Sequence, residues 1–86
     1  MTLPIRKLAD AFTETAIDEE VVVMSLASGD FFTLEHTARA IWLLIDGTRD
    51  RAAVLAALEA DYGPEVDADE VDAFLASLTV AGFVAA

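Results

Sequence analysis

Apolar residues follow a strand-like pattern in the first third of the chain and a helix-like pattern from about residue 34 onward. The early segments FTETAI at 12–17 and VVVMSL at 21–26 are rich in β-branched and aromatic residues, which favour strands. A Ser28-Gly29-Asp30 turn signal then precedes the segment FFTL, so a hairpin is expected here. We therefore predict three short strands, near residues 12–17, 20–26 and 30–34.

The second of these strands is apolar on both of its sides. Side chains alternate between the two faces of a strand, so Val22, Met24 and Leu26 share one face while Val21 and Val23 share the other. Contiguous apolar surface on a small protein is usually covered or used for binding. We expect either that other elements cover both faces or that one face is an interface.

After residue 34 the apolar positions recur with the period of a helix. The first stripe consists of Leu34, Ala38, Ile41, Trp42 and Ile45. Glycines at 47, 63 and 82 mark helix ends, and Asp50 is a suitable cap for the start of the second helix. The pattern predicts helices near residues 35–46, 50–62 and 66–81.

The inner stripes of these helices predict the core. Trp42 lies on the inner side of the first helix, and we expect it to be buried with Leu58, Phe74 and Leu78. Beyond Gly82, the segment Phe83-Val84 is expected to pack back onto this core.

Three strands followed by three helices indicate an α+β fold with a three-stranded antiparallel sheet, in a winged-helix-like arrangement. No linker, repeat or low-complexity segment interrupts the pattern, so residues 1–86 are predicted to form a single domain. The chain has no cysteine, and 56% of its residues are hydrophobic. Efficient packing, or burial against a partner, must therefore supply its stability.

The same composition predicts a cytoplasmic protein. No apolar run approaches the roughly 18 residues of a transmembrane helix, so no membrane association is expected. The N-terminal segment also lacks the apolar block of a secretory signal after Arg6 and Lys7.

The net charge of the chain favours some classes of binding partner and excludes others. Five Lys and Arg residues against sixteen Asp and Glu residues give a formal net charge of −11. A winged helix is also a DNA-binding scaffold, but DNA affinity needs basic residues, and the third predicted helix has acids and no Lys or Arg. Nucleic acid is therefore excluded. The acidic residues either form solvated faces or attract a basic peptide or protein surface.

Catalytic and metal-binding groups are scarce. His36 is the only histidine, and without cysteine it has no soft second ligand for zinc. It is expected in the first helical turn, solvated or touching Glu35. No glycine-rich phosphate loop or calcium-loop spacing occurs. We predict a binding module with no catalytic residue, metal or cofactor.

The order and spacing of the apolar anchors resemble those of the PqqD family over roughly residues 12–84. The matching positions are Leu34, Thr37, Ala38, Ile41, Trp42, Leu44, Ile45, Asp46, Gly47, Tyr62, Val71, Asp72, Phe74, Leu75, Leu78 and Gly82. Members of this family are peptide chaperones, also called RiPP recognition elements. The resemblance implies that the chain binds the leader of a ribosomally made precursor peptide and presents it to a modifying enzyme.

The resemblance also implies a site. In the family, the leader adds as a strand beside the third strand, in a groove closed by the third helix. On this sequence the implied peptide-binding residues are Asp30, Phe31, Phe32, Thr33, Leu34, Asp69, Asp72, Ala73 and Ala76. The alanines would admit a peptide backbone, and the two helix aspartates would meet Lys or Arg. Phe31 and Phe32 point to opposite faces, so only one is expected in the core. The other is either covered by the N-terminal segment or free for the peptide.

Several partners fit this resemblance. The implied enzyme is a radical SAM enzyme, a protease or a cyclase, and the sequence does not distinguish among them. The sequence also leaves open which precursor is served, the oligomeric state, and which side of the third helix lines the groove. The alternative function is an interaction module of the same fold that binds a partner enzyme without a leader peptide.

Overall fold

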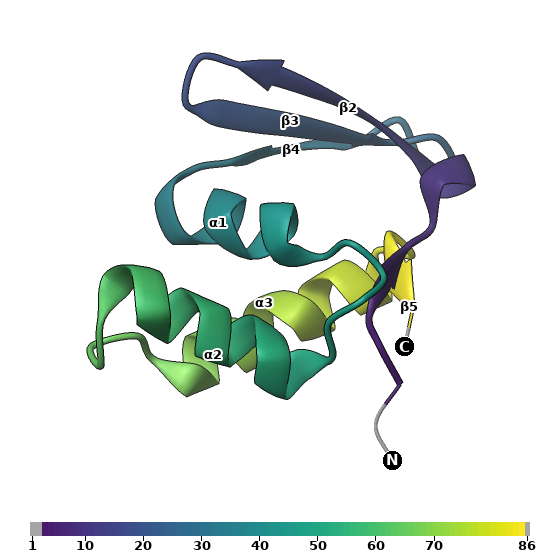
Figure 1. Cartoon of the computed structure of the whole chain (residues 1–86). Helices are drawn as coiled ribbons and strands as arrows, with labels where there is room; N and C mark the ends of the chain where they lie inside the picture. The colour runs from purple at the N-terminus through teal and green to yellow at the C-terminus, as the bar shows by residue number, and fades with distance from the viewer. Residues whose placement is uncertain (1–2, 86) are drawn as a thin grey trace.

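A three-stranded antiparallel sheet lies on one side of a layer of three helices in the computed structural model, which describes residues 3–85 (Figure 1). The strand order is β2-β3-β4, so β2 and β4 are the edges. The bounds of the strands are Phe12–Ile17 for β2, Glu20–Ser25 for β3 and Phe31–Leu34 for β4. Those of the helices are His36–Leu44 for α1, Arg51–Tyr62 for α2 and Ala68–Val80 for α3. The predicted α+β fold and its element order are confirmed.

The helix ends follow from local hydrogen bonds. The side chain of Asp50 accepts the Ala53 N–H at 2.9 Å, which confirms Asp50 as the cap of α2. The first helix ends two residues earlier than predicted, because the Ile45 N–H turns back to the Trp42 carbonyl. Asp67 caps α3, so this helix starts at Ala68 and not at residue 66.

A second, two-stranded sheet joins the two ends of the chain. The strands β1, Arg6–Lys7, and β5, Val84–Ala85, pair antiparallel, and neither was predicted from the sequence. A short 3-10 helix, η1, Ala9–Ala11, connects β1 to β2. Gly82 adopts a φ of +81°, a conformation that glycine reaches at low cost, and this turn directs Phe83 back into the protein.

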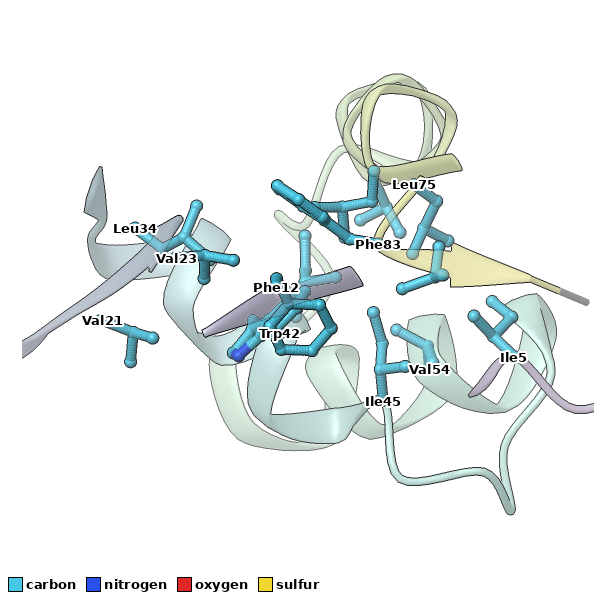
Figure 2. Packing of buried hydrophobic residues seen from close by; sticks show 14 of the residues in the cluster. Ile5, Phe12, Val21, Val23, Leu34, Trp42, Ile45, Val54, Leu75 and Phe83 are labelled. Atoms are coloured by element: carbon cyan, nitrogen blue, oxygen red, sulfur yellow. The ribbon is translucent and has the colours of Figure 1, made fainter. Parts of the chain in front are cut away.

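The core lies between the sheet and the helices (Figure 2). Trp42 and Leu58 are fully buried, and Leu78 is nearly so, which confirms these three predicted core residues; Val54 is fully buried as well. Phe83 and Val84 are also buried, as expected. Phe74 differs from the prediction, because it is only partly buried at the border of the core. This position makes Phe74 available to a surface groove.

Four aromatic rings link the sheet, α1 and the C-terminal segment. Trp42 packs edge-on against Phe12 at 5.1 Å between ring centroids and against Phe83 at 6.4 Å. Phe83 also contacts Phe12 and Phe32, at 5.5 and 5.7 Å. The cluster therefore runs without interruption from the buried indole to a side chain on the edge strand.

Between residues 3 and 85, no helix combines the length and the apolar character needed to cross a bilayer.

Candidate functional site

The strand β4 has an open edge. Within residues 3–85, its only strand partner is β3, with Val23 opposite Phe32 and Val21 opposite Leu34. The Ser25 N–H donates to the Asp30 carbonyl at 2.8 Å, which fixes the alternation of backbone groups along the pair. Phe32 and Leu34 therefore direct their backbone N–H and C=O groups toward β3. The corresponding groups of Phe31 and Thr33 face the open edge, where an added strand can pair with them.

An apolar groove lies between β4 and α3. Its walls come from both elements, and its lining is Val23, Phe32, Leu34, Phe74, Ser77, Leu78, Ala81 and Phe83. Seven of these eight side chains are apolar, so the groove favours apolar side chains of a ligand. Phe74, Ser77, Ala81 and Phe83 were not expected in the site from the sequence. The aromatic residue at 74, on the flank of the core stripe, was the available signal.

Phe32 is the most prominent side chain of the groove. It is 45% exposed, yet its ring packs edge-on against Phe83, which is only 2% exposed. Phe83 is itself held by the core aromatics, and its carbonyl accepts the Leu8 N–H at 2.8 Å. Because a fixed ring supports it, Phe32 presents a preorganised apolar surface to a ligand.

The expectation that either Phe31 or Phe32 is a core residue is wrong. Phe32 lies on the helix side of the sheet but stays at the groove, and Phe31 is 69% exposed on the opposite side. The N-terminal segment does not cover Phe31, because β1 pairs with β5 instead. β4 is a short edge strand, and in the described part of the chain no element packs over its outer side. Both phenylalanines are therefore accessible.

The side of α3 that was expected to line the groove faces elsewhere. Asp72 and Ala76 line a different hollow, together with Leu3, Ile5 and Arg51. Asp72 forms a two-pronged ion pair with Arg51 of α2, in which the Arg51 Nη2 lies 2.7 Å from Oδ2. The Asp72 side of the helix is therefore turned toward α2, and Phe74 and Ser77 are on the side toward β4.

The other two predicted helix residues also lie outside the groove lining. Asp69 is exposed, and its backbone N–H donates to the Asp67 side chain at 2.9 Å. Ala73 is exposed, and its carbonyl accepts the Ser77 hydroxyl at 3.0 Å. The structure thus brings together Phe32 and Leu34 with the Phe74 side of α3, and it separates Asp69, Asp72, Ala73 and Ala76 from them. Asp30, Phe31 and Thr33 remain at the edge strand itself.

Two acidic residues are sequence neighbours of the groove lining but are not part of it. Asp30 directly precedes β4, and Glu70 lies one helical turn before Phe74, where it lines a separate hollow with Thr37 and Tyr62. Both residues are exposed. Their charges favour basic residues in a ligand that runs along the groove.

His36 lies outside the groove. Its side chain is exposed and its Nε2 is 3.9 Å from the Glu35 carboxylate, as the sequence predicted.

The chain is similar to known proteins in both sequence and fold. The chain belongs to the PqqD family, since the family model described as coenzyme PQQ synthesis protein D matches residues 20–84. This match contains β3, β4 and all three helices, and so both walls of the groove. The resemblance noted in the sequence is confirmed. A comparison with curated proteins gives no match.

A solved structure of a second protein shares the fold. It is described as TbiB1 in complex with the TbiA(beta) leader peptide. Its TM-score is 0.74 at 29% sequence identity, with 91% of this chain and 93% of that chain covered. The similarity thus extends over nearly the full length of both proteins.

Proposed function

We propose that this protein binds the leader region of a ribosomally synthesised precursor peptide and presents it to a peptide-modifying enzyme. The observation that carries the proposal is the open edge of β4 beside an apolar groove. Membership of the PqqD family and the likeness to TbiB1, which was solved with a leader peptide, support it.

The leader would bind as a fourth strand next to β4. Its backbone would pair with the edge-facing groups of Phe31 and Thr33, which gives affinity with little dependence on sequence. Side chains on the helix side of the added strand would enter the groove and contact Phe32 and Phe74. These contacts would select apolar anchors at alternate leader positions.

Charge would assist the encounter. The protein carries a net charge of −11, and the exposed residues Asp30 and Glu70 adjoin β4 and the Phe74 turn of α3 in the sequence. A leader with Lys or Arg outside its apolar anchors would therefore associate faster at low salt. Asp72 is less suited to this role than the sequence suggested, because it is already paired with Arg51.

Titration calorimetry tests the proposal, with the leader encoded by the precursor gene beside the gene of this protein. A scrambled peptide of the same composition is the control. In parallel, amide shift mapping by NMR should show changes at residues 30–34 and at Phe74, Ser77 and Ala81, with α2 residues Glu59 and Asp61 unchanged. Equal binding of the scrambled peptide, or shifts outside the groove, would overturn the proposed site. Binding of the enzyme by a protein that binds no leader from any neighbouring precursor would favour the interaction-module alternative.

A further inference from the structure

The sheet has a second face that the groove does not use. In β3, Val21 and Val23 are buried against the helices at 2% and 1% exposure, so Val22 and Met24 point to the opposite side. The register places Thr13 and Phe31 beside Met24, and Thr15 and Thr33 beside Val22. We call this surface, together with Ile17 at the end of β2, the outer sheet face.

The outer sheet face consists of apolar side chains and threonines, and between residues 3 and 85 no element covers it. Ile17 is 52% exposed, Met24 is 38% exposed and Phe31 is 69% exposed. The remaining central positions are Val22 and threonines, which carry no charge. Figure 1 shows all three helices on the other side of the sheet. The expectation that other elements cover both faces of β3 is wrong, because among residues 3–85 nothing packs over this face.

Acidic residues border the outer sheet face at its hairpin end. The β2–β3 hairpin carries Asp18, Glu19 and Glu20. All the Lys and Arg residues lie outside this sheet: Arg6, Lys7, Arg39, Arg49 and Arg51. A second copy of the chain would bring the same carboxylates against this border and be repelled, as would an anionic lipid surface. The face fits a partner with an apolar centre and a rim of Lys or Arg.

We propose that the outer sheet face is the docking surface for the peptide-modifying enzyme. This inference rests on the proposed function, because it assumes that a leader strand adds to β4. A leader strand added to β4 would extend the same sheet, so that every second leader side chain would lie beside Phe31 and Thr33 on the outer sheet face. The enzyme would then contact this protein and the leader on one continuous surface, and would bind the loaded form more tightly than the free form.

The first test uses the double variant Ile17→Thr/Met24→Thr. Threonine keeps the strand propensity but removes apolar area, and neither position lies in the leader groove. The probe is the modifying enzyme encoded next to the precursor gene, measured by biolayer interferometry with and without the leader. We expect enzyme affinity to fall by about tenfold or more, as for central interface residues, with leader affinity unchanged. The control is Val80→Thr, since Val80 is 89% exposed on α3.

The second test concerns the acidic border. Glu19→Lys/Glu20→Lys should slow association with the enzyme, and the difference should shrink as salt rises. The control Glu59→Lys/Asp61→Lys makes the same change in net charge on exposed positions of α2. It should slow association less, because α2 belongs to the helix layer on the other side of the sheet (Figure 1).

The outcomes separate this inference from the proposed function. Unchanged enzyme binding in both double variants would overturn the docking surface even if the leader binds normally. Loss of enzyme binding in these variants, with no leader bound by any form, would support the docking surface while removing the proposed function. Sedimentation velocity gives the remaining check. A dimer of the parent that dissociates in Ile17→Thr/Met24→Thr would show that the face contacts a second copy, and would overturn the proposal.

Discussion

The indole Nε1 of Trp42 donates a hydrogen bond of 2.7 Å to the Glu14 carboxylate. This bond joins α1 to the inner side of β2 and satisfies the one polar group of a fully buried side chain. The Lys7 ammonium lies 4.2 Å from the centre of the same ring system, in a cation–π contact. Burial lowers the pKa of Lys7, while the Glu14 and Asp46 carboxylates raise it. Trp42 thus connects β1, β2 and α1.

Truncation of this residue should remove most of the stability. We expect Trp42→Ala to lower the free energy of unfolding by about 3–5 kcal/mol, because a large buried side chain leaves a cavity. For a domain of this size that approaches the whole stability. Urea unfolding followed by circular dichroism measures the change, with Trp42→Phe as the milder control. A Trp42→Ala variant nearly as stable as the parent would show that the helix layer does not depend on this contact.

The hydrogen bond can be examined separately from the packing. In Glu14→Ala the buried indole N–H loses its acceptor, which should cost about 1–3 kcal/mol. Glu14→Gln keeps an acceptor oxygen, so its loss should be smaller. The same unfolding assay compares the two variants. Equal losses would indicate that the charge of Glu14, facing Lys7, matters more than the hydrogen bond.

The Arg51–Asp72 pair should contribute to stability above about pH 4. Hydrogen bonding to Arg51 lowers the pKa of Asp72 from its ordinary value of 3.8. As the pH falls through 3.8 toward the lower folded value, the unfolded chain binds the proton first, so stability falls. Asp72→Asn should therefore be less stable than the parent at neutral pH, and should lose less stability on acidification below pH 4. Thermal melts between pH 2.5 and 7 measure this, with Asp61→Asn correcting for the change in net charge.

A proline at the open edge should separate folding from leader binding. The Thr33 N–H faces away from β3, so Thr33→Pro removes no bond within the sheet but does remove a donor for the leader strand. We expect Thr33→Pro to keep a parental circular dichroism spectrum and to lose leader binding. Thr33→Ala keeps the N–H and should bind normally. Parental leader affinity in a folded Thr33→Pro variant would rule out pairing at this position.

Much of the fold is determined by local patterns. The strand runs and the helical stripe that starts at Leu34 predicted every element of the main sheet and all three helices. The β1–β5 pair was missed because a two-residue strand has no measurable alternation, and its pairing depends on the return of the chain after Gly82. Helix ends shifted by one or two residues where a cap or a turn hydrogen bond intervened.

The site was less predictable for a geometric reason. Val71, Leu75 and Leu78 define the buried stripe of α3, but the two flanks of a stripe are equivalent until neighbouring elements are placed. In this protein Arg51 of α2 pairs with Asp72, so the side of α3 that carries Asp72 faces α2. The side that carries Phe74 lines the groove beside β4. Opposite charges at 51 and 72 were visible in the sequence, but a pairing 21 residues apart is not fixed by helical spacing.

Phe32 should be the main apolar contact for a leader. It is half exposed and is supported by Phe83, so Phe32→Ala removes ligand-accessible area while the core aromatics stay in place. We expect leader affinity to fall by about tenfold or more, which corresponds to roughly 1.4 kcal/mol. The loss of unfolding free energy should be clearly smaller than for Trp42→Ala. Calorimetry with the leader measures the first effect, and urea unfolding measures the second.

The matched control for Phe32→Ala is Tyr62→Ala, which truncates an aromatic ring that is 56% exposed outside the groove. It should leave leader affinity within about twofold of the parent, since residues outside the buried centre of an interface contribute little. If both variants bind the leader alike, the ring of Phe32 is not a contact, and affinity must come from backbone pairing along β4. A loss confined to Phe32→Ala would instead place leader side chains between Phe32 and α3, where the groove is lined by Phe74 and Ala81.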